Sequence, residues 1–80
     1  LEYGKSAIEI RENMLSKDDR VVLIDDLIAT GGSFKAAEDL VRICGATPVC
    51  AVAVIRLMEL EGEKALSIPL HYLVNLSDSH

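Results

Sequence analysis

The chain has 80 residues, of which 50% are hydrophobic and 26% charged, and it carries a formal net charge of -5. This composition is typical of one small globular domain and excludes a disordered or fibrous chain. The eight lysines and arginines form no basic stripe, which argues against a nucleic-acid partner. No apolar run approaches the ~20 residues that span a bilayer, so we expect no membrane contact and a cytoplasmic protein.

The first predicted elements precede a glycine-rich segment. Ala7 to Arg11 alternates apolar and charged side chains, which predicts a half-buried strand, with a short helical turn running into Asn13 as the alternative. Ser16 to Asp19 is polar and is expected to form a turn. Val21 to Ile24 is a continuous run of β-branched residues and leucine, which predicts a strand buried on both faces of a parallel sheet.

A helix is predicted from Ser33 to Cys44, after a loop over Asp26 to Gly32. Its apolar stripe at helical spacing consists of Phe34, Ala37, Val41 and Cys44. Two pairs of opposite charge, each four residues apart, are expected on the opposite face: Lys35 with Asp39, and Glu38 with Arg42. Ser33 is expected to cap the amino-terminal end of the helix, and Gly45 to stop it.

Two further strands complete the pattern of an α/β fold. They are predicted at Val49 to Leu57 and His71 to Leu76, with a short helix at Glu61 to Leu66 between them. Strand, helix and strand in this order predict a right-handed βαβ unit with a parallel sheet. Such a sheet needs helices on both faces, and only one convincing helix is present, so the missing cover must come from absent sequence or from a partner. Together with a start at Leu1 rather than methionine, this indicates a piece of a longer protein.

The segment after the strand at Val21 to Ile24 has the features of a phosphate-binding loop. Ligands of open parallel sheets bind outside the carboxyl ends of the strands, where this segment lies. Gly31 and Gly32 let backbone amides approach an anion, Thr30 and Ser33 add hydroxyl donors, and the helix amino terminus adds about half a positive charge. The spacing matches neither a nucleotide-hydrolase P-loop nor a dinucleotide fold. The sequence therefore predicts a site for a phosphate monoester.

Two consecutive acids, Asp25 and Asp26, stand between the strand and this loop. Carboxylates repel phosphate but accept hydrogen bonds, so the vicinal diol of a sugar is their natural partner. Adjacent strand residues point to opposite faces, so both acids can reach one ligand only if the strand breaks between them. Phosphate on one side and a diol on the other predict a ribose 5-phosphate. The alternative, acids that only cap a turn and glycines that only permit it, fits the ordered combination after a buried strand less well.

The stretch VVLIDDLIATGGSF, from Val21 to Phe34, resembles the phosphoribosyl-diphosphate signature of type I phosphoribosyltransferases. Within that family, the form DDLIATGGS is most similar to the adenine-specific members, and so are LEYGKSAIEI before it and IRLMELEGEKAL after it. The resemblance covers nearly the whole chain. It implies a type I phosphoribosyltransferase fold, a parallel sheet with flanking helices. Residues 1–80 would form the C-terminal, phosphoribosyl-diphosphate-binding part of that domain, with its N-terminal half missing.

The resemblance also implies a reaction in purine salvage. Adenine and 5-phosphoribosyl diphosphate would give AMP and diphosphate, with Mg²⁺ carried on the diphosphate and no metal bound directly by the chain. Asp25 and Asp26 would hold the ribose hydroxyls. The 5-phosphate would be wrapped by Ala29, Thr30, Gly31, Gly32 and Ser33. Positive charge builds at the anomeric carbon as diphosphate leaves, and a nearby carboxylate favours it, so Asp25 would also be catalytic. Family members are generally homodimers.

Three further positions outside the signature are candidates for the site. By resemblance, Glu2 and Tyr3 match the end of a mobile loop that closes over the substrates; Glu2 would handle a purine ring proton as acid or base, although an exposed acid is the alternative. Leu57 lies at the end of the second apolar strand, on the same sheet edge as Asp25, and is expected to pack on the base, although most such leucines are core. Arg56 departs from the family, in which an acid is more usual.

Two rival interpretations remain. Some purine-sensing repressors reuse this fold to bind phosphoribosyl diphosphate without turning it over, and such a regulator would carry an upstream DNA-binding domain. Alternatively, the chain is an inert remnant, because the segments that contact adenine and diphosphate should precede Leu1; alone it is expected to be inactive. The presence of Glu2 favours the enzyme over the regulator.

Overall fold

The computed structural model describes residues 15–77 of the chain. The predicted strand at Ala7 to Arg11 and the candidate residues Glu2 and Tyr3 lie outside the described residues. The described elements follow one another as β1 (Arg20–Ile28), α1 (Gly32–Ile43), β2 (Thr47–Leu57), the 3-10 helices η1 (Met58–Leu60) and η2 (Gly62–Ala65), and β3 (Leu70–Leu76). The short helix predicted at Glu61 to Leu66 is therefore the 3-10 helix η2, and η1 before it was not predicted.

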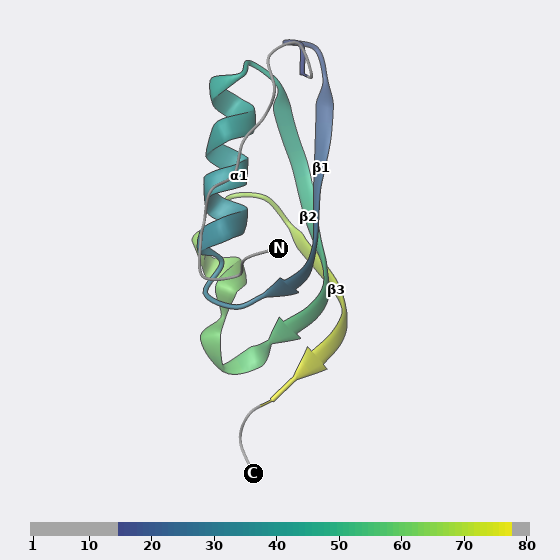
Figure 1. The fold of residues 1–80 in the computed structure, drawn as a ribbon, viewed down its shortest axis with the longest axis vertical. Helices are drawn as coiled ribbons and strands as arrows, with labels where there is room; N and C mark the ends of the chain where they lie inside the picture. Colours follow the sequence, from purple (N-terminus) through teal and green to yellow (C-terminus); the bar gives the residue numbers. More distant parts are fainter. Residues whose placement is uncertain (1–14, 78–80) are drawn as a thin grey trace.

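The three strands form one parallel sheet with β2 in the centre. The register places Leu23 of β1 opposite Ala51 of β2, and Ala51 opposite Leu70 of β3. All carboxyl ends therefore meet at one edge of the sheet, the lower edge in Figure 1. This sheet confirms the predicted parallel α/β arrangement. The prediction was possible because the apolar runs have the length of strands, and the amphipathic segment between two of them has the 3.6-residue period of a helix.

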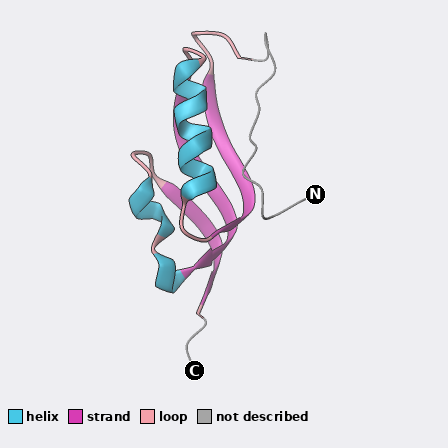
Figure 2. Cartoon of the chain, turned by 60° about the vertical axis from the view of Figure 1, so that its left-hand side comes forward, coloured by secondary structure: helices cyan, strands magenta, loops and turns pink. Residues whose placement is uncertain are grey.

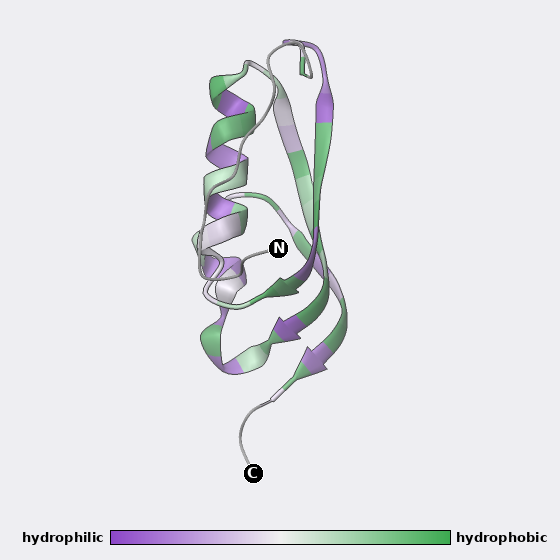
Figure 3. Cartoon of the chain, in the orientation of Figure 1, coloured by the Kyte–Doolittle hydropathy of each residue, from purple (hydrophilic) through white to green (hydrophobic). Residues whose placement is uncertain are grey.

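Helices cover one face of this sheet in the described part of the chain, and α1 and both 3-10 helices lie on that side (Figures 1 and 2). Apolar and polar residues alternate along α1 (Figure 3), as an amphipathic helix requires. The core between helix and sheet consists of Leu23, Ile28, Phe34, Val41, Ala46, Ala51 and Ala53. The opposite face is open there, with Ile24 73% and Leu73 78% exposed. The run Val21 to Ile24 is therefore buried on one face only, which corrects the prediction.

β1 continues through both acids to Ile28 instead of ending before them. Leu23 and Ile28 are five positions apart in this strand, so strict alternation would point them to opposite faces. Both are nevertheless buried in the same core cluster. The alternation is thus interrupted in the segment that contains Asp25 and Asp26, although hydrogen bonding to β2 continues beyond them.

The ends of α1 differ from prediction at one terminus only. The N-cap is Gly31, in the left-handed conformation with φ 89°, and not Ser33. At the other end Gly45 also adopts positive φ, and the amides of Gly45 and Ala46 donate to Arg42 and Val41, which is a Schellman motif and confirms the predicted stop. Cys44 is exposed and does not belong to the buried stripe.

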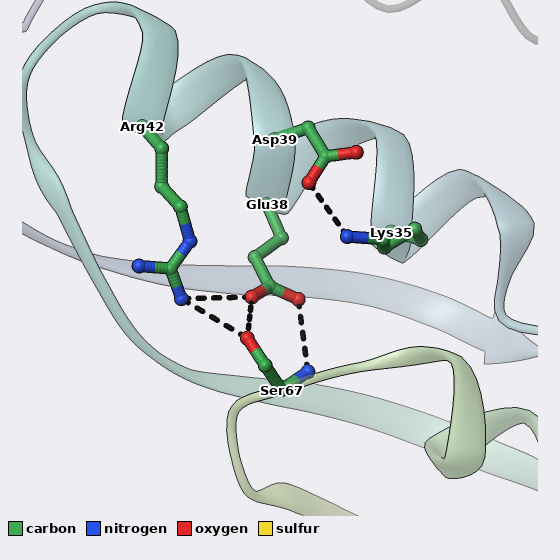
Figure 4. A network of polar contacts seen from close by, with 5 residues as sticks. All are labelled: Lys35, Glu38, Asp39, Arg42 and Ser67. Carbon is green, nitrogen blue, oxygen red and sulfur yellow. Dashed lines mark hydrogen bonds and ion pairs between the residues drawn. The ribbon is translucent and has the colours of Figure 1, made fainter.

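Glu38 was expected on the outer face of α1 and is instead fully buried. Its carboxylate accepts hydrogen bonds from the backbone amide of Ser67 at 3.2 Å, from the Ser67 hydroxyl, and from Arg42 at 2.8 Å (Figure 4). Burial favours the protonated acid, but these hydrogen bonds outweigh it and lower the pKa of Glu38 to about 2. The other predicted pair, Lys35 with Asp39, is exposed as expected. Glu38 therefore ties α1 to the segment that leads into β3.

Replacing Glu38 by alanine should lower the free energy of unfolding by about 2 to 3 kcal/mol, because the charge-assisted hydrogen bonds that its buried carboxylate accepts from Ser67 and Arg42 are lost. Asp39→Ala, which removes an exposed ion pair on the same helix, should change it by less than about 0.5 kcal/mol. Because the folded pKa of Glu38 lies below its ordinary value of 4.5, its contribution is complete above pH 4.5 and is lost as the pH falls towards about 2. Urea unfolding at several pH values measures both effects, and equal losses in the two variants would contradict this role.

Candidate functional site

A cavity of about 500 Å³ opens where β1 ends and α1 begins. Its lining comes almost wholly from one continuous segment, with one residue added by β2: Asp25, Asp26, Leu27, Ile28, Ala29, Thr30, Gly31, Ser33, Phe34 and Ile55. The position is the carboxyl edge of the parallel sheet, where ligands of open α/β sheets bind. The structure therefore places a hollow at the predicted location.

The amino terminus of α1 supplies free donors at this cavity. The first helical amides have no partner within the helix, and the N-cap residue Gly31 has no side chain that could cap them. The first turn holds no acidic residue, while the exposed Thr30 and Ser33 stand on either side of the terminus. The amide of Gly32 is 3.3 Å from the Thr30 hydroxyl oxygen, to which it donates. Such a terminus favours a phosphate both by donors and by the helix dipole.

Asp25 and Asp26 both line the cavity although they are consecutive in a strand. The interrupted alternation of β1 accounts for this. The strand was predicted to break between the two acids so that both could reach one ligand. Instead it continues, and a local distortion brings both acids to the cavity. The amide of Asp26 donates to Oδ1 of Asp25 at 2.8 Å, which turns that carboxylate back over the next residue. Both side chains are exposed, so their remaining acceptor positions are free for hydroxyl donors of a ligand.

Gly31 lies in direct backbone contact with Gly62 of η2. A Cβ at Gly31 would stand 2.2 Å from the Gly62 carbonyl oxygen, and a Cβ at Gly62 would stand 2.4 Å from the carbonyl oxygen of Ala29. Both glycines are buried. The loop is thus supported from behind by a turn that lies about thirty positions later in the chain. Sequence reasoning missed Gly62; its signal was a lone glycine within the segment predicted as a short helix.

Among the predicted substrate contacts, Asp25, Asp26, Ala29, Thr30, Gly31 and Ser33 line the cavity. Gly32 and Leu57 do not line it, and Ile55 is the β2 residue that does. Gly32 has φ outside the left-handed region, and a Cβ there would meet only the Thr30 hydroxyl, at 3.5 Å. Gly31 is therefore the position at which the backbone conformation requires glycine. At Gly32, the absence of a side chain leaves the amino terminus of the helix accessible. The ligand roles of these residues stay predictions.

The described residues lack two features that would indicate another kind of site. Among residues 15–77, no group of three or more histidine, cysteine, aspartate or glutamate residues is placed to hold a metal ion. Within the same residues, no helix has the length and hydropathy needed to cross a membrane.

Comparison with known proteins matches residues 4–69 to the phosphoribosyl transferase domain family. The adenine phosphoribosyltransferase of Methylobacterium nodulans is 52% identical over 77 residues, which cover 92% of this chain and 42% of that protein. The adenine phosphoribosyl transferase of Trypanosoma brucei, solved with AMP, pyrophosphate and ribose-5-phosphate, has a TM-score of 0.76 at 39% identity, covering 85% of this chain and 34% of that one. The Saccharomyces cerevisiae enzyme gives 0.80 at 35% identity, covering 85% and 40%. The chain spans less than half the length of these relatives.

Proposed function

Because the chain belongs to the phosphoribosyl transferase domain family, we propose that the complete protein carrying it transfers the 5-phosphoribosyl group of phosphoribosyl diphosphate to adenine, giving AMP and diphosphate. The observation that carries the proposal is one cavity lined by two consecutive carboxylates and by a helix amino terminus whose N-cap is a glycine. Adenine as the acceptor is supported by the names of the relatives, 52% and 39% identical. The protein would act in purine salvage, as a cytoplasmic homodimer.

The proposed division of labour follows the order of residues along the loop. Amides at the start of α1, with the Thr30 and Ser33 hydroxyls, bind the 5-phosphate. Asp25 and Asp26 accept hydrogen bonds from the ribose hydroxyls. As the bond from the anomeric carbon to diphosphate breaks, positive charge develops on the sugar, and the same carboxylates stabilise it. The substrate is phosphoribosyl diphosphate with its Mg²⁺, which neutralises the leaving diphosphate.

The adenine half of the reaction rests on fewer described residues. Ile55 lines the cavity from β2 and offers apolar surface for a flat base, while Leu57, two positions on, stays a second candidate for base packing. By the resemblance, Glu2 is proposed as the acid or base for a ring proton, and Tyr3 as a further substrate contact. A Leu57→Ala variant that keeps the KM for adenine would assign the packing role to Ile55.

The direct test is an assay of the complete protein with labelled adenine, phosphoribosyl diphosphate and Mg²⁺. We expect AMP to form, with hypoxanthine and uracil accepted at least about 100-fold less well, because a site built to hydrogen-bond one base edge rejects another. Phosphoribosyl diphosphate binding without any nucleotide formation would favour the regulator and overturn the enzyme. Formation of a different nucleotide would overturn adenine as the substrate.

Glu2→Ala should separate catalysis from binding. If Glu2 handles a ring proton, its loss should lower kcat by roughly 100-fold or more while phosphoribosyl diphosphate affinity is nearly retained. Steady-state kinetics together with calorimetry measure the two quantities. An unchanged kcat would remove Glu2 from the mechanism and leave it an exposed acid.

A further inference from the structure

An arginine-centred cluster lies at the carboxyl edge of the sheet, among residues that do not line the cavity. The guanidinium of Arg56 donates to both carboxylate oxygens of Glu63, at 2.9 and 2.7 Å, and to Oδ1 of Asn75 at 2.9 Å. It also lies over the ring of Tyr72, 5.4 Å from the centroid. One side chain of β2 is thus joined to η2 and to β3, and it is only 13% exposed.

This geometry uses properties specific to arginine. The planar fork matches a carboxylate with two parallel hydrogen bonds, which fixes direction as well as distance. The hydrogen bond to Asn75 and the stacking on Tyr72 hold the guanidinium from two other sides. The hydrogen bonds of Arg56 lower the pKa of Glu63, so the pair is ionised at neutral pH. Arg56 therefore anchors η2 to the sheet at one defined place.

η2 needs such an anchor, because little else in its own sequence holds it. It is a single 3-10 turn of four residues, a geometry with poor hydrogen bonds that is used only in short pieces. It is entered through Glu61 at φ 47°, a left-handed conformation that is unfavourable for a residue other than glycine. Surrounding contacts must offset that cost, and the bidentate pair at Glu63 is the strongest polar contact described for this turn.

Glu63 is the immediate neighbour of Gly62, whose backbone lies against the loop of the cavity. A Cβ built on Gly62 would be 2.4 Å from the Ala29 carbonyl oxygen and 3.0 Å from the Gly31 amide nitrogen. With no side chain between the two segments, a displacement of η2 is passed directly to the backbone that presents donors to the ligand. A misplacement of about 1 Å can cost 100-fold in rate even when the mutated residue is remote.

We propose that Arg56 is a positioning residue for the phosphate-binding loop, acting through Glu63 and Gly62. The inference rests on the proposed function, because it assumes that the loop binds the 5-phosphate. The resemblance leads one to expect an acid at position 56, where this chain carries arginine. The inference accounts for this difference, because Glu63 of η2 supplies the opposite charge.

The test compares the complete protein with Arg56→Gln, Glu63→Gln and the exchanged double variant Arg56→Glu with Glu63→Arg. Each single variant should raise the KM for phosphoribosyl diphosphate and the Kd for ribose 5-phosphate by between about 10- and 100-fold. The KM for adenine should change less than about twofold. The double variant should recover most of the loss, because the ion pair is restored in the reverse sense.

Lys64→Gln is the matched control. It removes the exposed pair of Lys64 with Glu61 on the same turn, so all constants should stay within about twofold. Equal losses for phosphoribosyl diphosphate and adenine, or a double variant no better than the single ones, would overturn the positioning role. A fall in melting temperature with unchanged ribose 5-phosphate affinity would overturn it as well. If the unmodified protein binds no ribose 5-phosphate, the proposed function fails instead.

Discussion

Gly31→Ala should severely weaken the binding of phosphoribosyl diphosphate. Gly31 has φ 89°, and the added Cβ would stand 2.2 Å from the carbonyl oxygen of Gly62, a distance that no packed structure accepts. The clash involves backbone on both sides, so it cannot be relieved by a rotamer change and must move the loop or η2. Calorimetric titration with phosphoribosyl diphosphate should show an affinity at least about 100-fold weaker.

The neighbouring glycine provides the control for this prediction. A Cβ at Gly32 meets only the Thr30 hydroxyl, at 3.5 Å, so Gly32→Ala should leave the free energy of unfolding within about 1 kcal/mol of the unmodified protein. Any loss of ligand binding in Gly32→Ala would then report crowding of the ligand itself. Gly31→Ala that binds normally would show that the contact with Gly62 does not shape the loop.

Asp25→Asn and Asp26→Asn should each lower kcat/KM by at least about 100-fold while the protein stays folded. An amide replaces one acceptor of the carboxylate by donors, which oppose the donors of a ribose diol, and it removes the charge that stabilises the transition state. Both side chains are exposed, so little folding energy depends on them. Kinetics with phosphoribosyl diphosphate and thermal unfolding together measure the two effects.

The control is Asp39→Asn, an exposed acid on α1 that pairs with Lys35 at 2.8 Å. It carries the same chemical change outside the cavity lining, so kcat/KM should stay within about twofold. If Asp25→Asn and Asp26→Asn also leave kcat/KM unchanged, the two carboxylates do not touch the ribose. The acids would then be no more than turn residues.

The parts of the fold that the sequence predicts are those set by local periods. Apolar runs of strand length gave β1, β2 and β3, and the 3.6-residue stripe with a terminal glycine at Gly45 gave α1. The phosphate loop was predictable for the same reason, because the donors at a helix amino terminus are consecutive in the chain. Local chemistry at consecutive positions needs no knowledge of distant contacts.

The features that escaped prediction depend on residues far apart in the chain. Glu38 has the spacing of a surface ion pair, and only the approach of Ser67 makes its burial favourable. Gly62 is an unremarkable glycine until Gly31 is placed against it. Arg56 stands where the resemblance predicts an acid, and its partner Glu63 is found only once η2 is folded back on the sheet. Periodicity carries no information on which distant segment meets which face.

The central claim is that the loop between β1 and α1 binds the 5-phosphate of the ligand. It is tested most directly by titrating the complete protein with AMP and, in parallel, with adenosine, which differ only by that phosphate. We predict that AMP binds at least about 100-fold more tightly, a difference of about 2.7 kcal/mol, and that Gly31→Ala removes this difference. Equal affinity for AMP and adenosine in the unmodified protein would contradict the claim.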